Sequence, residues 1–269
     1  MKNTDTVDRR TVVGALTAAS LGLVLEGVVP RVARALPPNG TIVLVHGAWA
    51  DGSNWQRVIN PLERQGLKVI CAPIPLTTLS DDIAALQRTL ERTTGPVVLV
   101  GHAYAGGVIG AIHDDRVKSL VYVAALAPAE GETVADVFYK DPKPPQSPKL
   151  APDAHGFIWM PDDGVRNALA QNASAEEKHI AAAVQRPIAV QCIQEKAPAP
   201  AWPGKPVWFL VAEEDRMINP KTQRFMAGRM SAKVRSLRVD HSPQISAPTH
   251  VVDVIMEAAR ATLPQGVGA

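Results

Sequence analysis

Three positions of this chain suggest acyl transfer. Two of them have a residue type that this chemistry requires, and the third lies in a motif that normally contains the nucleophile. The stretch "LVGHAYAGGVI" (residues 99–109) reads as a strand, a tight turn and a helix, which is typical of the nucleophile elbow G-x-S-x-G. Ala103 stands where that motif has its serine. Asp215, in "VAEEDRMINP", is the candidate acid that orients the base, and His241, in "VDHSPQISAP", is the candidate base.

Acyl transfer also needs donors for the developing oxyanion. "HGAW" follows an apolar run, and its Gly47 would let the backbone turn so that the N–H of Ala48 points into a site. The second expected donor is the N–H of Tyr104, directly after the nucleophile position, at the start of a helix whose dipole favours negative charge. Taken by itself, "HGAW" is equally compatible with an ordinary tight turn.

Alternatives exist for the acid and for the base. Glu213 and Glu214 precede Asp215, so this segment could be a solvated acidic loop, and Glu130 is the alternative acid. His102 flanks the elbow and is expected to support the turn and to lie beside substrate. The remaining histidines are expected on helices, in a cap or at a helix start: His113, His179, His155 and His250. No spacing of His and Cys predicts a metal site, and no cofactor is expected.

Elements that could position these groups alternate along the chain. Apolar, β-branched runs predict strands at residues 41–47, 67–73, 96–102, 119–126, 206–215 and 233–239. Helices are expected from near Ser53, from a cap at Ser80, from Tyr104, from Asn219-Pro220 and over residues 249–262. Continuous apolar strands alternating with helices predict an α/β fold with a doubly wound, mostly parallel sheet.

Residues 128–203 interrupt this alternation. They hold 11 of the 23 prolines, contain no convincing strand and show two or three short helices. We interpret them as a helical cap inserted over the carboxyl edge of the sheet, where α/β folds bind ligands. Aromatic residues in the cap and beside the oxyanion turn are expected to contact substrate, although each could simply pack the cap on the sheet: Trp49, Phe138, Tyr139, Phe157 and Trp159.

The first 35 residues read as an export leader. Arg9-Arg10 precede an uncharged stretch over residues 11–25, and small residues end in Ala33-Arg34-Ala35. This pattern predicts a secretory signal, and the paired arginines favour the twin-arginine route. The alternative is an amphipathic helix that stays attached. We expect the mature protein to be a single domain, residues 36–269, in the periplasm or secreted, without a stable membrane span.

Composition excludes some partners. Removal of residues 1–35 takes five basic and three acidic residues with it, which leaves 23 of each. A neutral chain gives no electrostatic reason to expect nucleic acid or an anionic membrane as a partner, so a small-molecule ester is the expected one. Cys71 lies in an apolar run and is expected as a core thiol, with a disulfide to Cys192 as the alternative.

From about residue 41 to 263 the chain resembles the α/β-hydrolase superfamily, in particular its small bacterial esterases, plant methylesterases and hydroxynitrile lyases. The matching stretches are "IVLVHGAW", "VVLVGHAYAGGVI", "LVYVAALAP", "EEDRMINPKTQRFMA" and "DHSPQISAP". The chain order of nucleophile position, acid and base is also that of this superfamily. The resemblance implies a catalytic serine at position 103, with Asp215 and His241 as its partners and Ala48 and Tyr104 as oxyanion donors.

Two details of this resemblance favour ester hydrolysis. The similar lyases typically have threonine at the position of Gly47 and lysine at the position of Ser242, and this chain has neither. The aspartate nucleophile of dehalogenases and epoxide hydrolases is also absent, because position 103 is alanine.

The alanine at position 103 has three interpretations. We favour an engineered Ser-to-Ala replacement, because the residues that would surround a serine look intact and alanine removes little beyond one oxygen. A natural pseudoenzyme that binds a ligand without cleaving it is the second interpretation. The third is chemistry carried out by the His241–Asp215 dyad alone, such as a lyase reaction.

Overall fold

The structure of this chain is a computed structural model that describes residues 40–264. The expected leader, residues 1–35, lies outside this range. Within the range, no helix has both the length and the apolar character needed to span a bilayer.

A six-stranded parallel sheet forms the centre of the described chain, with the strand order β2-β1-β3-β4-β7-β8. Each of the six predicted strands is present, with small shifts at the ends. Their bounds are β1 Thr41–Val45, β2 Lys68–Ala72, β3 Val97–His102, β4 Val117–Val123, β7 Val207–Ala212 and β8 Lys233–Leu237. This confirms the expected α/β class with a mostly parallel sheet.

Burial follows the residue types of the strands. The apolar strands β1, β3 and β7 are buried along their whole length, as both-face coverage of a parallel sheet requires. The edge strands β2 and β8 begin with lysine and are more exposed, and β8 also carries Arg235. Charged residues on an edge strand discourage pairing with another chain.

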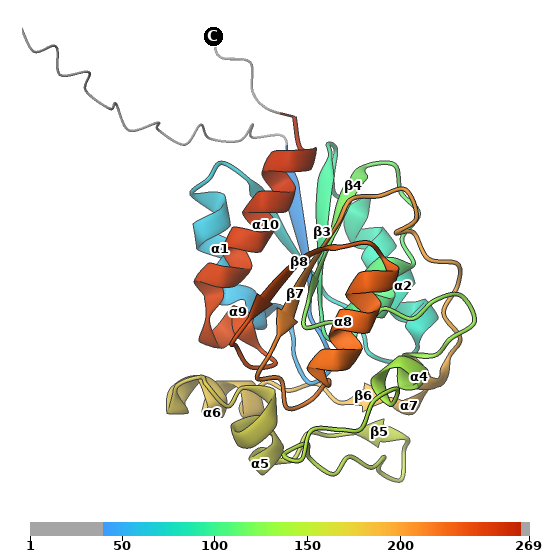
Figure 1. The fold of residues 1–269 in the computed structure, drawn as a ribbon, viewed down its shortest axis with the longest axis vertical. Coiled ribbons are helices and arrows are strands. Elements are labelled where there is room, and N and C mark those ends of the chain that lie inside the picture. Colours follow the sequence, from blue (N-terminus) through green and yellow to red (C-terminus); the bar gives the residue numbers. More distant parts are fainter. Residues whose placement is uncertain (1–39, 265–269) are drawn as a thin grey trace, which may run out of the picture. The chain divides into compact units, whose positions relative to one another are not determined.

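Helices cover both faces of the sheet (Figure 1). One apolar core lies between the sheet and α1 and α10, and the other lies between the sheet and α2, α3, α8 and the inserted segment. Their bounds are α1 Gln56–Glu63, preceded by a 3-10 turn at Gly52–Trp55, α2 Leu79–Leu90, α3 Ala105–Gly110, α8 Pro220–Arg229, α9 Pro243–Ser246 and α10 Pro248–Thr262.

Side-chain caps fix two of these helix starts. Asn219 caps α8, with Pro220 in its first turn, as predicted. The expected cap of α2 at Ser80 is wrong, because Thr78 accepts the N–H of Asp81 and the helix begins at Leu79. Ser80 and Thr78 are both good capping residues. Thr78 has the extended backbone that an N-cap residue adopts, so the helix begins directly after it.

The segment between β4 and β7, called the cap below, lies at one end of the sheet (Figure 1). The expectation that it contains no strand is wrong, because β5 (Phe157–Ile158) and β6 (Ile188–Ala189) pair antiparallel. Two-residue strands are too short to leave an alternating pattern in the sequence. The helical pieces are α4 Val134–Phe138, α5 Asp162–Gly164, a π-helical turn at Val165–Leu169, α6 Ala175–Ala183 and α7 Val190–Gln194.

The two cysteines are free, so the disulfide alternative is wrong. Cys192 is buried in α7, whereas Cys71 on the edge strand β2 is only partly buried.

Candidate active site

The nucleophile elbow predicted from the sequence is present between β3 and α3. Ala103 is buried and has a φ of +50°, a left-handed conformation that is costly for a residue with a side chain. Its N–H donates to the carbonyl of Val123 at 3.2 Å, and its carbonyl accepts the N–H of Leu126 at 2.9 Å. Position 103 therefore has the strained backbone that such elbows give their nucleophile.

Glycines allow this turn to pack tightly. A Cβ at Gly106 would collide with the carbonyl oxygen of Leu126, which follows β4. A Cβ at Gly47 would lie 2.9 Å from the Cβ of Ala103 and 3.0 Å from the carbonyl oxygen of His102. The "HGAW" turn and the elbow are thus in direct contact, which neither motif by itself could show.

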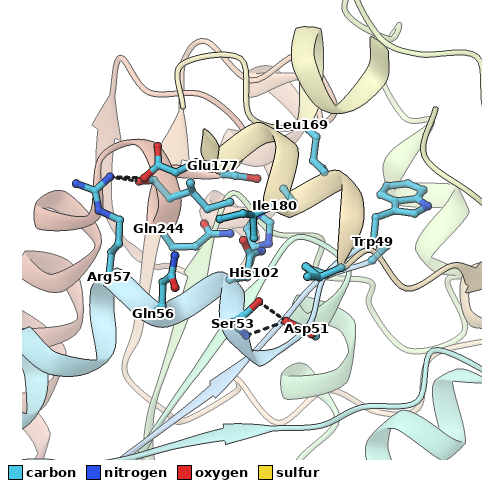
Figure 2. A pocket seen from close by; sticks show the side chains of 17 residues that line it. Trp49, Asp51, Ser53, Gln56, Arg57, His102, Leu169, Glu177, Ile180 and Gln244 are labelled. Carbon is cyan, nitrogen blue, oxygen red and sulfur yellow. Dashed lines mark hydrogen bonds and ion pairs between the residues drawn. The ribbon is translucent and has the colours of Figure 1, made fainter. Parts of the chain in front are cut away.

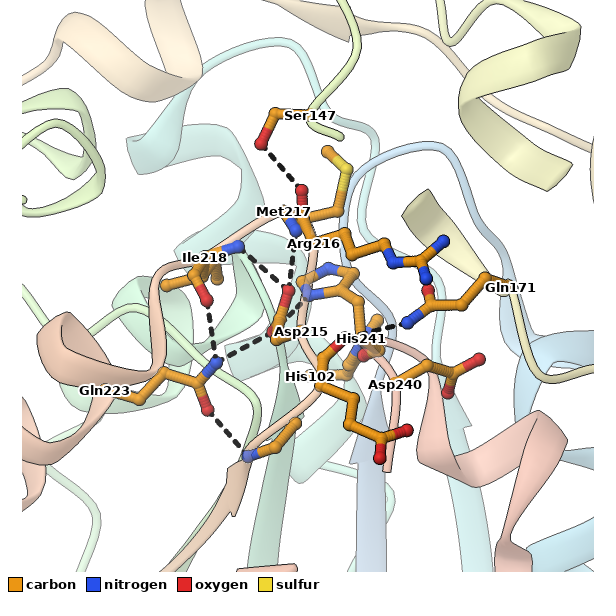
Figure 3. Close-up of polar contacts among 12 residues, drawn as sticks. His102, Ser147, Gln171, Asp215, Arg216, Met217, Ile218, Gln223, Asp240 and His241 are labelled. Carbon is orange, nitrogen blue, oxygen red and sulfur yellow. Dashed lines mark hydrogen bonds and ion pairs between the residues drawn. The ribbon is translucent and has the colours of Figure 1, made fainter. Parts of the chain in front are cut away.

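The predicted acid and base meet in the structure (Figure 3). Nδ1 of His241 lies 2.8 Å from Oδ2 of Asp215, and both side chains are buried. Asp215 follows β7 and His241 follows β8, so both lie at the carboxyl edge of the sheet with Ala103. The carboxylate that meets the imidazole belongs to Asp215 and not to Glu130.

Three further donors fix the carboxylate of Asp215. Oδ1 accepts the N–H groups of Met217 at 2.7 Å and Ile218 at 2.9 Å, and Oδ2 accepts Nε2 of Gln223 at 2.7 Å. Gln223 is fully buried in α8 and also accepts a backbone N–H through its own oxygen. Sequence reasoning missed Gln223, because a glutamine on an amphipathic helix gives no sign of the loop that it faces.

His102 is hydrogen-bonded to the backbone of the candidate base, His241. Its Nε2 donates to the backbone carbonyl of His241 at 2.8 Å, and the two rings lie 5.0 Å apart. Burial lowers the pKa of His102 to about 3, so the ring is neutral at ordinary pH. A neutral, donating imidazole at this place positions the loop of His241 and does not compete for its proton.

The cap is hydrogen-bonded to the loops of both members of the pair, and Figure 3 shows Gln171, which contacts the acid loop. Nε2 of Gln171 donates to the carbonyl of Glu214 at 2.7 Å, next to Asp215. The N–H of Asn172 donates to the buried carboxylate of Asp240 at 2.9 Å, next to His241. One short cap segment therefore holds the acid loop and the base loop together.

An apolar cavity of about 80 Å³ opens at these groups. Ala103, His241 and both expected oxyanion residues, Ala48 and Tyr104, line it. The rest of the wall comes from the cap and from the loops after β1, β4 and β7, and is almost entirely apolar: Trp49, Leu126, Val134, Ala135, Phe138, Tyr139, Leu150, Ile158, Ile188, Ile193, Met217 and Ile218.

The predicted substrate contacts divide into two groups. Trp49, Phe138 and Tyr139 line the apolar cavity, and the indole N–H of Trp49 donates to the carbonyl of a cap residue in β5 at 2.9 Å. Phe157 packs against the core, and Trp159 is half exposed with its indole N–H 3.3 Å from a carboxylate of the cap. Neither Phe157 nor Trp159 lines this cavity.

A second, smaller cavity of about 40 Å³ shares Ala48 and Trp49 with the first (Figure 2). His102 lines this cavity and not the apolar one. Nη1 of Arg57 on α1 contacts Oε1 of Glu177 on α6 at 2.8 Å, so an ion pair joins the cap to the helical layer here. Its wall mixes apolar side chains with more polar ones than the first cavity has: Asp51, Ser53, Asn54, Gln56, Arg57, His102, Glu177, Ser242 and Gln244.

His113 is the other histidine expected near the elbow helix. His113 follows α3 and is not on a helix, contrary to expectation, and its Nε2 contacts the carbonyl of Ala199 at 2.9 Å. Among residues 40–264 no cluster of three or more His, Cys, Asp or Glu side chains could hold a metal ion.

This arrangement defines the class of the molecule. A parallel sheet places a strained elbow, a buried His–carboxylate pair and a close glycine turn at one edge, which is the architecture of an α/β-hydrolase-type site.

Comparison with known proteins assigns the family. A sequence profile of the alpha/beta hydrolase family matches residues 42–254. A pyrethroid hydrolase of Sphingobium wenxiniae is 26% identical over 250 residues, which covers 82% of this chain and 88% of that protein. A carbendazim hydrolyzing esterase of Nocardioides sp. is 31% identical over 110 residues, which covers 34% of this chain and 44% of that protein. The chain belongs to the alpha/beta hydrolase family.

Solved structures share the fold. Polyneuridine aldehyde esterase superposes with a TM-score of 0.71 at 18% identity, and the match covers 82% of this chain and 99% of that one. A pyrethroid hydrolase from Sphingobium faniae superposes with a TM-score of 0.71 at 21% identity, covering 82% of this chain and 98% of that one.

Proposed function

We propose that this site is that of a serine-type carboxylic ester hydrolase in which Ala103 occupies the place of the nucleophile. One observation carries the proposal. His241, which is paired with the buried Asp215, lines the same cavity as Ala103, a left-handed residue at a strand–helix elbow. The names of the pyrethroid hydrolase and the carbendazim esterase support the same class of reaction.

With a serine at position 103, the reaction would follow the usual acyl-transfer course. The hydroxyl oxygen would attack the ester carbonyl carbon while His241 takes its proton and Asp215 stabilises the resulting imidazolium. The N–H groups of Ala48 and Tyr104 would donate to the carbonyl oxygen as it becomes negative. His241 would then protonate the departing alcohol, and a water molecule would release the acid from the serine by the same steps.

The chain as given has no group at position 103 that can attack. By comparison with triad deletions in other enzymes, kcat is expected to be about a million-fold below that of the serine form. Ester binding should persist, because the cavity walls and the oxyanion donors do not depend on a serine oxygen. We interpret Ala103 as an engineered replacement, with a natural ligand-binding pseudoenzyme as the second candidate.

The expected substrate is a neutral ester with a compact apolar portion. The cavity wall carries no acidic or basic side chain other than His241. Its volume of about 80 Å³ is roughly half of the 150 Å³ that encloses a benzene molecule in an engineered cavity. Short-chain acyl esters are therefore suitable probes. The leader-like residues 1–35 support the further proposal that the protein acts outside the cytoplasm.

The test is to assay Ala103→Ser and the parent chain against nitrophenyl acetate and butyrate. We expect a gain in kcat of several orders of magnitude for Ala103→Ser. Adding His241→Ala to Ala103→Ser should abolish the gain. Circular dichroism and thermal unfolding establish that each variant is folded. A folded Ala103→Ser protein without any gain would contradict ester hydrolysis and favour the binding function.

A further inference from the structure

A fully buried carboxylate, that of Asp82, lies behind the elbow. Asp82 is in the first turn of α2, and its Oδ2 accepts the phenol hydroxyl of Tyr104 at 2.6 Å. Its Oδ1 accepts the N–H of Leu76 at 2.7 Å, and the thiol of Cys192 on α7 lies 3.7 Å from Oδ2. One carboxylate therefore joins the elbow, the loop before α2 and the cap.

The loop that Asp82 holds also carries part of the cavity wall. Leu76 is buried with a φ of +62°, and its carbonyl accepts the N–H of Ala189 in β6 at 3.0 Å. Ile188 in β6 and Ile193 in α7 both line the apolar cavity. Asp82 is thus linked through one residue to the cap strand beside the substrate cavity.

The partners of Asp82 are uncharged. Burial raises the pKa of Asp82 to about 6, partly opposed by its hydrogen bonds from Tyr104, Leu76 and Cys192. The neighbouring Asp81 raises the pKa further. Burial also raises the pKa of Cys192 to about 12 and that of Tyr104 well above its usual value. Of these three hydrogen-bonded side chains, only Asp82 therefore changes charge near neutral pH.

We propose that Asp82 is a positioning residue that fixes the backbone N–H of Tyr104 in the oxyanion site through its hydrogen bond to the Tyr104 hydroxyl. This proposal rests on the proposed ester-hydrolase function for its catalytic meaning. Tyr104 directly precedes Ala105, the first residue of α3, so a hydrogen bond that anchors its phenol restrains the backbone that carries its N–H. A charged acceptor holds the phenol more strongly than a neutral one, because hydrogen bonds to ionised groups are the stronger ones.

The first test uses the chain as it stands and needs no activity. The amide ¹⁵N and ¹H shifts of Tyr104 are followed by NMR from pH 8 to pH 5 in the parent, in Asp82→Asn and in the matched control Asp81→Asn. Asp81 lies in the same helical turn but is exposed and bonds only to Thr77 and Thr78. We expect a titration of the Tyr104 amide near pH 6 in the parent and in Asp81→Asn, and none in Asp82→Asn. A Tyr104 amide that does not titrate in the parent would overturn the proposal.

The second test measures turnover in the Ala103→Ser background, with and without Asp82→Asn. Effects of pH that are common to both proteins cancel in the ratio of their kcat values. We expect Asp82→Asn to lower kcat about tenfold at pH 8 with little change in KM, and the ratio to approach one below pH 6, where Asp82 is itself neutral. A ratio that is constant with pH would contradict the positioning role, whereas an inactive Ala103→Ser protein would contradict the proposed function instead.

Discussion

The buried imidazole of His102 predicts a specific dependence of stability on pH. In the unfolded chain a histidine takes up a proton below a pKa of about 6.5, whereas burial holds the pKa of His102 in the folded protein at about 3. Between these two values the unfolded state binds one proton more than the folded state. The free energy of unfolding therefore falls as the pH falls through this range, and His102 gives its full contribution only above pH 6.5.

The magnitude follows from the width of the range. One pKa unit corresponds to about 1.4 kcal/mol, so between pH 6.5 and pH 4 the folded protein loses about 3 kcal/mol through His102. We expect His102→Gln to be less stable than the parent at pH 7.5, because the hydrogen bond to the carbonyl of His241 is altered. On acidification to pH 4 the parent should lose about 3 kcal/mol more than the variant does.

Urea unfolding followed by circular dichroism at intervals from pH 7.5 to pH 4 provides the assay. His46 is also buried, with a pKa lowered to about 4, but it is present in both proteins and cancels in the difference. A difference in unfolding free energy between His102→Gln and the parent that stays constant with pH would contradict the lowered pKa of His102.

Further predictions concern stability and thiol chemistry. Gly106→Ala should destabilise the protein by about 2 kcal/mol or more in thermal unfolding, because the added Cβ meets a backbone carbonyl, whereas Gly228→Ala, in open space on α8, should be neutral or stabilising. Asp82 is protonated more readily when folded, so its contribution opposes that of His102. As the pH rises from 4 to 6, the parent should lose about 2 kcal/mol of unfolding free energy that Asp82→Asn does not lose, as measured by urea unfolding. Equal pH slopes for the two proteins would contradict the raised pKa. Cys71 and Cys192, with pKa values raised to about 11 and about 12, should react with a thiol reagent at pH 8 only after unfolding, and rapid labelling of the native protein would contradict this.

Much of the fold could be predicted because it depends on patterns that are local in the sequence. Runs such as "TIVLV" and "PVVLV" are buried on both faces only in a covered parallel sheet, and they mark the strands directly. In such a sheet all carboxyl ends lie at one edge, so residues directly after the strands must meet there. This is why the sequence alone indicates that Asp215 and His241, 26 residues apart, lie together.

The supporting residues could not be predicted, because their partners are set by packing between distant elements. Gln223 and Asp82 look like ordinary helix residues in the sequence, and only the contact of α8 with the acid loop and of α2 with the elbow gives them a role. The same limit explains why Phe157 and Trp159 are expected to contact substrate but do not line the apolar cavity. An aromatic residue in a cap can face the cavity or the core, and composition does not decide between these directions.

The most direct test of the central claim is covalent labelling at position 103. If the site lacks only its nucleophile, a serine placed there should be activated by His241 and Asp215. We predict that Ala103→Ser, treated with a fluorophosphonate ester, gains the mass of one phosphonyl group at position 103, whereas the parent and Ala103→Ser combined with His241→Ala remain unlabelled. A folded Ala103→Ser protein that is not labelled would contradict the claim that the remaining groups form a working triad.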